Sequence, residues 1–217
     1  MNGFSFLLSS KRESVLRSRF RTFFENENFS LYQSKSALFA LSTSHIGIDK
    51  FHIFNDGSAV LVHGTAFIQD GYGSIEPSDV LARLERGDLS FLNEFEGSFA
   101  CIAYHAPSEN YVFWNDQSST VDAYFWDNAS EQIYSTNSVS VAKIAEPGLS
   151  PRGTRQFLAR GSIMAPDTLF QGIRRLSLGE SIARIGRGHA FKQSHWQPQV
   201  EPDWENRSKN SCAREIA

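Results

Sequence analysis

The segment that most restricts the fold is residues 98–104, SFACIAY, because it is apolar on both faces of an extended strand. A strand that borders solvent shows an apolar side chain only at every second position, and this run does not follow that pattern. It therefore predicts a central strand of a sheet that is covered on both sides. Hydrophobic residues make up 41% of the 217 residues, and 18 residues are Phe, which suits a sheet-rich core of this kind.

Short apolar runs with turn residues between them surround this strand and predict antiparallel layers. The turn signal at 55–58, NDGS, predicts a hairpin. The segment at 76–79, EPSD, predicts a helix start, because Pro suits the first turn and carboxylates favour its positive end. Strands are expected at 4–8, 37–41, 45–53, 59–62, 98–104, 111–114, 123–126, 133–135 and 176–185, and helices at 76–86, 91–95 and 153–160. The mixture predicts an α+β fold rather than a doubly wound parallel sheet.

Two further features receive a structural interpretation. Residues 11–21 are basic, and we interpret them as a solvated helix face or loop in preference to an anion site. Cys101 lies inside the central strand and is interpreted as an inert core residue. Cys212 lies far from it in a different context, so the two cysteines predict neither a disulfide framework nor a zinc site.

Charge and hydropathy exclude several classes of function. The net charge of −3 and the pI near 6.1 argue against a dedicated nucleic-acid binder, which carries a strong basic excess. No apolar run approaches the ~20 residues of a membrane span. The N-terminal MNGFSFLLSS has no basic region before its short apolar stretch, so it makes a poor signal peptide and a cytoplasmic location is expected.

Four segments carry a family resemblance. Residues 157–179, FLARGSIMAPDTLFQGIRRLSLG, match the pattern YLxxGxIPAPxTxFxGIxxLPPG without a gap. Residues 92–104 match LxxLxGxFAFAIY, and residues 115–125 keep the Asp and the first Tyr of RDRxGxxPLYY. Met1-Asn2-Gly3 stands where the family has Met-Cys-Gly. These patterns belong to the glutaminase domain of the asparagine synthetase family, including its β-lactam synthetase and lasso-peptide cyclase relatives, which residues 1–196 resemble.

The resemblance implies a fold and a domain boundary. It implies the N-terminal-nucleophile hydrolase fold, a four-layer αββα arrangement with two stacked antiparallel sheets. The segment at 161–170, which contains Pro166, is expected to form an ordered loop packed under the sheets. From residue 197 the composition becomes polar and Pro-containing, so residues 197–217 are interpreted as a linker and the start of a truncated synthetase domain.

The resemblance also implies where catalysis occurs in active members of the family. Met1 is removed, the exposed Cys attacks the side-chain amide of glutamine, and the α-amine of that Cys relays the proton. Asn2 stands at this position, and its amide nitrogen has no available lone pair. Neither Cys101 nor Cys212 can replace the missing nucleophile. Covalent glutaminase chemistry is therefore expected to be absent.

The glutamine pocket implied by the resemblance is altered as well. The family has an Asn-Gly-Glu segment that supplies an oxyanion donor and a backbone N–H, and His63, Gly64 and Thr65 stand in its place. Gly64 is kept and His63 could donate a hydrogen bond, although we favour a strand-end His without a task. The Arg that holds the glutamine carboxylate has no counterpart in residues 45–54, and the Gly-Asp pair that holds the amine has none around Asp79.

Three functions stay open on this basis. The first is a non-catalytic glutaminase-like domain of an ATP-dependent amide-forming ligase of the asparagine synthetase, β-lactam synthetase or peptide cyclase type. The second is a stand-alone module that binds an amino acid or peptide, and the third is an active glutamine amidotransferase domain. No Ser-Gly-Gly-x-Asp-Ser or Walker-type phosphate loop occurs, so no cofactor or metal is expected in this chain. ATP and magnesium are expected only in a partner synthetase domain of the ATP-pyrophosphatase type, in cis or in trans.

Overall fold

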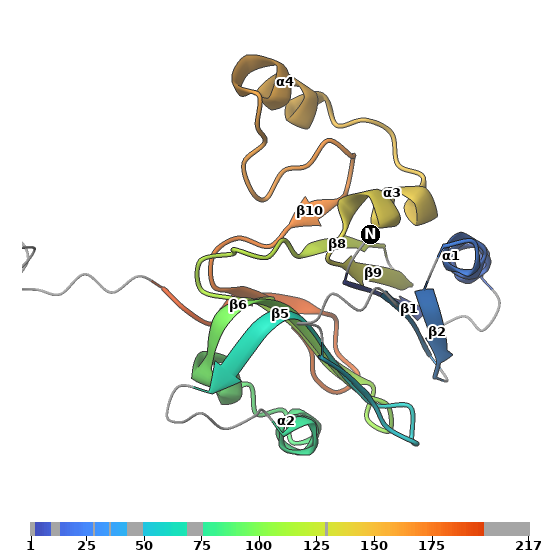
Figure 1. Cartoon of the computed structure of the whole chain (residues 1–217), viewed down its shortest axis with the longest axis vertical. Helices are drawn as coiled ribbons and strands as arrows, with labels where there is room; N and C mark the ends of the chain where they lie inside the picture. Colours follow the sequence, from blue (N-terminus) through green and yellow to red (C-terminus); the bar gives the residue numbers. More distant parts are fainter. Residues whose placement is uncertain are drawn as a thin grey trace, which may run out of the picture.

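Two six-stranded antiparallel sheets form the centre of the molecule, with helices on their outer sides (Figure 1). The computed structural model describes residues 3–9, 14–27, 29–34, 36–42, 50–68, 76–128 and 130–197. The α+β class expected from the sequence is confirmed.

The first sheet is built around the N-terminal strand. β1 pairs with β3 on one side and with β9 on the other, so it lies inside the sheet, as its fully buried sequence requires. The strands, in order across the sheet, are β10 (Arg174–Arg175), β8 (Tyr124–Asp127), β9 (Glu131–Ser135), β1 (Phe4–Ser9), β3 (Ala37–Ser42) and β2 (Phe29–Gln33).

The second sheet contains the run that is apolar on both faces. β6 lies between β5 and β7 along its whole length, and this confirms the central strand predicted for residues 98–104. The predicted hairpin turn at 55–58 joins β4 to β5. The strands, in order, are β12 (Phe191–Ser194), β11 (Glu180–Arg184), β7 (Asn110–Asn115), β6 (Phe95–His105), β5 (Ala59–Ile68) and β4 (Lys50–Ile53).

Three hydrophobic clusters hold the layers together. The largest fills the space between the two sheets, where Phe6 from β1 meets Tyr104 from β6 at a ring-centroid distance of 5.5 Å. A second cluster lies on the outer face of the second sheet and contains Cys101 and Trp114. A third lies on the outer face of the first sheet and contains Phe20. Alternate residues of β6 enter the first and second clusters, which is why this strand is apolar throughout.

Helices cover both outer faces and complete the four-layer αββα arrangement, which is confirmed. α1 (Val15–Glu25) and α3 (Ser138–Ala145) pack on the first sheet, while α2 (Pro77–Glu85) and the short 3-10 helix η1 (Ser90–Glu94) pack on the second. Figure 1 shows α2 on the side of the sheets opposite to α1 and α3.

One helix lies away from this sandwich. α4 (Pro151–Arg160) projects beyond α3 at the top of Figure 1. Residues 161–170 form an irregular segment, as predicted. The expectation that this segment packs under the sheets is wrong, because it follows α4 outward and Met164 is 59% exposed.

The structure also corrects the interpretation of the basic segment. Residues 15–21 do begin a helix, α1, which Ser14 caps by accepting a hydrogen bond from the amide of Arg17 (3.0 Å). Ser18 and Arg21 are exposed, as interpreted, whereas Arg17 departs from that interpretation because it is only 4% exposed; residues 11–13 lie outside the described residues.

Candidate functional site

The site begins where the N-terminal strand enters the first sheet. The amide of Phe4 donates to the hydroxyl of Thr136 (3.2 Å), and the amide of Ser42 donates to the carbonyl of Gly3 (3.0 Å). Gly3 has a φ of 106°, and a Cβ at this residue would overlap the Thr136 hydroxyl. The glycine that follows Asn2 is therefore required by both backbone conformation and space.

His63 from the other sheet reaches the same point. An ideal Cβ built on Gly3 would lie 3.3 Å from Cγ of His63. His63 stands two residues after Leu61, whose side chain lies between the sheets, so alternation along β5 turns His63 inward as well. Both sheets thus contribute to one group of residues at this end of the sandwich. We call Gly3, His63, Gly64, Thr65 and Thr136 the candidate site.

Two glycines allow β5 and β6 to approach closely beside the candidate site. Gly64 has a φ of 97°, and a Cβ there would overlap the carbonyl oxygen of Ser98. Gly97 has a φ of 119°, and a Cβ there would overlap the carbonyl oxygen of Thr65. Gly97 belongs to one of the four segments that carry the family resemblance, and Gly64 to the pocket segment that the resemblance implies. His63 and Gly64 are partly buried at this crossing and Thr65 is exposed, so the site opens to solvent at Thr65.

Asp116 organises the turn next to the candidate site. This carboxylate is buried and accepts hydrogen bonds from the amides of Phe99 (3.2 Å) and Ser118 (2.9 Å). It also accepts from both the amide (3.0 Å) and the hydroxyl (2.7 Å) of Thr120. The Thr120 hydroxyl in turn bonds the hydroxyl of Ser98 on β6. Because its oxygens are already saturated, Asp116 holds the loop in place and is not available as a general base.

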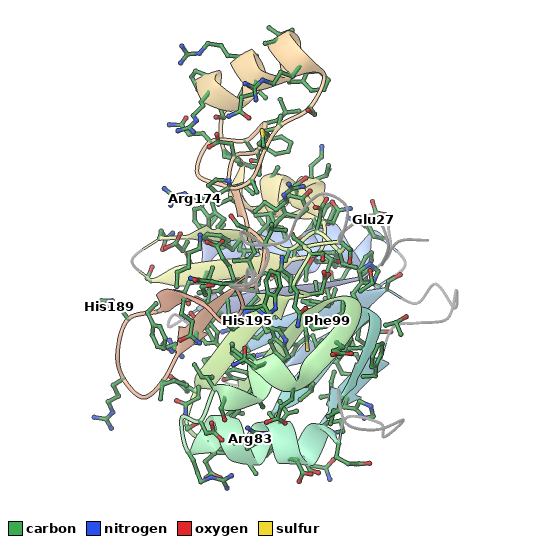
Figure 2. The ribbon with its side chains drawn as sticks, turned by 90° about the vertical axis from the view of Figure 1, so that its left-hand side faces the viewer. Glu27, Arg83, Phe99, Arg174, His189 and His195 are labelled. Carbon is green, nitrogen blue, oxygen red and sulfur yellow. The ribbon has the colours of Figure 1, made fainter. Side chains whose placement is uncertain are left out.

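His195 follows β12 directly and contacts the last residue of β7, Asn115. Its amide donates to the carbonyl of Gly179 (2.8 Å), and its ring forms a hydrogen bond with the backbone of Asn115. Burial lowers the pKa of His195 to about 4, so the imidazole is neutral at neutral pH. Figure 2, which labels His195 and Phe99, shows this side of the molecule. The half-buried, neutral imidazole, with one ring nitrogen bonded by the backbone of Asn115, holds the end of β12 beside the end of β7.

The structure brings some of the site residues predicted from the sequence to the candidate site and places others elsewhere. Asn2 lies outside the described residues, while the structure brings His63 and Gly64 to the glycine that follows it. Cys101 is fully buried and burial raises the pKa of its thiol, so the prediction of a core cysteine is confirmed. Asp79 is exposed in the first turn of α2, on the outer side of the second sheet, and does not enter the candidate site.

Three hydroxyl residues near the candidate site were not expected. Ser98 and Thr120 stand at unspecified positions of the family patterns and Thr136 lies outside them; the pairing of β5 with β6, the loop after β7 and the end of β9 bring these residues there. In the described ranges, no group of three or more His, Cys, Asp or Glu side chains is placed to hold a metal ion. None of the described helices is long and apolar enough to cross a membrane.

The fold and this site together define a two-sheet αββα domain with a glycine-lined junction at its N-terminal strand. No protein-family model matches the sequence, and no curated protein matches it. Among solved structures, the glutamine phosphoribosylpyrophosphate (PRPP) amidotransferase from B. subtilis complexed with ADP and GMP is similar over 90% of this chain and 50% of its own, with 6% identity and a TM-score of 0.48. A structure described as the allosteric regulatory enzyme of purine biosynthesis is similar over 91% of this chain and 44% of its own, with 8% identity and a TM-score of 0.45.

This chain therefore spans about half the length of the solved chains that it resembles. A likeness of this degree does not extend to activity, ligands or partners.

Proposed function

We propose that this chain is a glutaminase-like domain without its nucleophile, belonging to or pairing with an ATP-dependent amide-forming ligase. The observation that carries the proposal is the close approach of His63 to Gly3, the residue directly before β1. It places His63-Gly64 beside the residue that follows Asn2 in the chain. This arrangement supports the proposal that residue 2 stands at a former nucleophile position, where this chain has an Asn.

Residue chemistry supports the absence of glutamine hydrolysis. Acyl transfer from an amide needs a thiolate or hydroxyl that a neighbouring base can activate. The amide nitrogen of Asn2 is delocalised into its carbonyl and cannot attack. Cys101 cannot substitute, because it is fully buried in β6 and burial keeps its thiol protonated.

The groups that would hold glutamine are also missing from the sequence. Residues 45–54 contain no Arg, and Asp79 lies on the outer side of the second sheet. Each charged hydrogen bond to a ligand contributes on the order of 1.5–3 kcal/mol. Without two such contacts, glutamine binding is expected to weaken by roughly two to four powers of ten.

The partner that we propose is a synthetase domain of the ATP-pyrophosphatase type, which would bind ATP and magnesium. α4 supports a docking role, because it projects from the sandwich with apolar side chains in solvent: Phe157 is 47% exposed and Leu158 is 79% exposed. Exposed large apolar side chains that gather on one projecting element are typical of a surface that another domain covers.

The proposal is tested by measuring ammonia release from glutamine for the unmodified chain and for Asn2→Cys. Neither protein is expected to turn over glutamine, because the substitution restores the thiol and leaves the two ligand contacts absent. Asn2→Ser serves as a matched control with the same N-terminal processing. Mass spectrometry of each protein checks whether Met1 has been removed, so that a blocked N-terminus is not mistaken for an inactive one.

Two outcomes would contradict the proposal. Turnover by the unmodified chain would show an active amidotransferase domain with a different nucleophile. Strong turnover by Asn2→Cys would show that the glutamine site is intact and only the thiol has been lost. Thermal stabilisation of the isolated chain by glutamine or a short peptide would instead favour a stand-alone binding module.

A further inference from the structure

A cavity lies at the opposite end of the sandwich from the candidate site. It has a volume of about 1260 Å³ and lies between α1, the end of β2 and the turn at Asn55–Gly57. β5 runs from this turn to His63, so its first residues separate the cavity from the candidate site. The cavity shares no residue with the candidate site, and its function is therefore independent of the one proposed above.

Arg17 is the unusual residue of this cavity. Its side chain lines the cavity, the residue is only 4% exposed, and burial lowers the pKa of its guanidinium. Within the described part of the chain, neither Nη1 nor Nη2 of Arg17 has a hydrogen-bond partner. An ionised group out of water and without a partner is strongly unfavourable, and arginine does not escape the cost by deprotonating. A ligand that supplies acceptor oxygens would remove this cost.

Other donors on the same helix face point to an anion. Ser14 and Arg21 line the cavity three residues before and four residues after Arg17, so these three residues lie on one side of α1; Ser18, next to Arg17 in the chain, also lines the cavity. The cavity includes the first turn of α1, where the helix dipole favours negative charge, and this turn contains no acidic residue. Arg21 keeps one nitrogen on the Gln33 side chain and has further donors free to turn toward a ligand.

The negative charge of Glu131 partly offsets the effect of burial on the pKa of Arg17, but no carboxylate is hydrogen-bonded to its Nη1 or Nη2 in the described residues. Asp56 at the cavity edge accepts from the amide (2.8 Å) and hydroxyl (2.9 Å) of Ser58, and Glu131 accepts from the hydroxyl of Ser9 (3.0 Å). Glu25, which also lines the cavity, stands two turns of α1 away from Arg17. None of these three carboxylates is within ion-pair distance of Arg17 in the described residues.

We propose that this cavity binds a phosphate group, with Arg17 and Arg21 as its guanidinium ligands and the serines of the first turn as additional donors. A tetrahedral oxyanion offers enough acceptor oxygens for two guanidinium forks, whereas one carboxylate saturates a single fork. The cavity has room for more than a free ion, so the group can be inorganic phosphate or the phosphate of a small metabolite.

Thermal unfolding of the full chain tests the proposal. About 10 mM inorganic phosphate is expected to raise the unfolding midpoint by at least about 2 °C over chloride at equal ionic strength. Malonate, a planar dicarboxylate control, is expected to give less. AMP forms the second arm: a larger shift with AMP than with phosphate at equal concentration assigns the site to a phosphorylated metabolite, and an equal shift assigns it to the phosphate group alone.

Variants connect the shift to the cavity. Arg17→Met is expected to abolish the phosphate shift without lowering the midpoint in chloride, because it removes an unpaired buried charge. Arg21→Ala is expected to reduce the shift and, as a surface change, tests the site even if Arg17→Met fails to fold. Arg174→Ala is the matched control, since Arg174 is exposed on β10, at the edge of the first sheet opposite to β2, and does not line the cavity. Absence of a shift in the unmodified chain, or an undiminished shift in Arg21→Ala and Arg17→Met, would overturn the proposal.

Discussion

Glycines with positive φ set the geometry of the candidate site residue by residue. Gly3, Gly64 and Gly97 all adopt backbone conformations that L side chains rarely reach, and each faces a backbone or hydroxyl oxygen where a Cβ would stand. Backbone conformation and lack of space are therefore enough to require glycine at these three positions, without any catalytic role. The resemblance at Gly64 and Gly97 therefore reflects first how closely β5 and β6 pair.

Gly64→Ala is expected to destabilise the fold by about 2–4 kcal/mol, because the left-handed conformation costs about 1–2 kcal/mol and the overlap with Ser98 adds to it. Gly186→Ala is the matched control. Gly186 has a similar positive φ of 66°, but no heavy atom lies within 4 Å of its ideal Cβ, so only the conformational cost of about 1 kcal/mol remains. Urea unfolding of both variants measures the difference. Equal losses would mean that β6 moves away at no cost.

At the scale of elements, α4 is expected to contribute little to the stability of the sandwich. Leu158→Ala on α4 is predicted to change the free energy of unfolding by less than about 0.5 kcal/mol, since Leu158 is 79% exposed. Leu84→Ala on α2 is the same substitution at a fully buried position and is predicted to cost about 2–5 kcal/mol. Chemical denaturation of both variants checks the contrast.

A large loss from Leu158→Ala would show that α4 packs on the sandwich in solution. That result would also remove the argument that α4 is a docking surface, because its apolar side chains would then be part of the core.

The elements that the sequence predicts well are those whose signal is local. The apolar run in β6, the turn at 55–58 and the Pro at the start of α2 each act within a few residues. α3 was not predicted, because its Val139 and Val141 resemble a strand and only Asn137 marks its start by accepting hydrogen bonds from the amides of Val139 and Ser140.

Two strands were missed or shortened for related reasons. β2 is an edge strand with partly exposed side chains, including Tyr32, so its apolar pattern is weak. β5 was predicted to end at residue 62, because the apolar run stops before His63, whereas pairing with β6 continues to Ile68. Strand pairing depends on the partner strand, which local composition does not encode.

At the scale of the whole molecule, the candidate site could be predicted in part. The family resemblance selected His63 and Gly64, but nothing in the sequence places Thr136 beside Gly3, since that contact depends on how β9 and β1 pair. The burial of Arg17 was missed for the same reason: a basic helix face is usually solvated, and only the packing of α1 on the first sheet reveals that Arg17 is buried.

Three buried phenols join the two sheets at the centre of the molecule. The hydroxyl of Tyr111 on β7 bonds the hydroxyl of Tyr134 on β9 (2.8 Å) and donates to Gln132 (2.6 Å). Tyr104 on β6 bonds the hydroxyl of Ser36 (2.7 Å). Burial raises the pKa of Tyr111 to about 12, and it raises those of Tyr104 and Tyr134 as well.

These phenols predict a steep loss of stability in alkali. The unfolded chain releases the phenol protons at about pH 10, whereas the folded chain retains those of Tyr111 and Tyr134 towards pH 12, so the folded state binds more protons and stability falls as pH rises through this range. Each retained proton contributes about 1.4 kcal/mol per pH unit, so these two together contribute about 5–6 kcal/mol over two units, which is comparable to the stability of a marginal domain, and the raised pKa of Tyr104 acts in the same direction. Phenolate absorbance and circular dichroism are therefore expected to change together in one transition.

Tyr111→Phe should reduce the slope of unfolding free energy against pH by about one proton, while Tyr32→Phe, at a residue that is 43% exposed, should leave it unchanged. Ionisation of all tyrosines near pH ~10 with intact circular dichroism would show instead that water reaches the phenols between the sheets without unfolding.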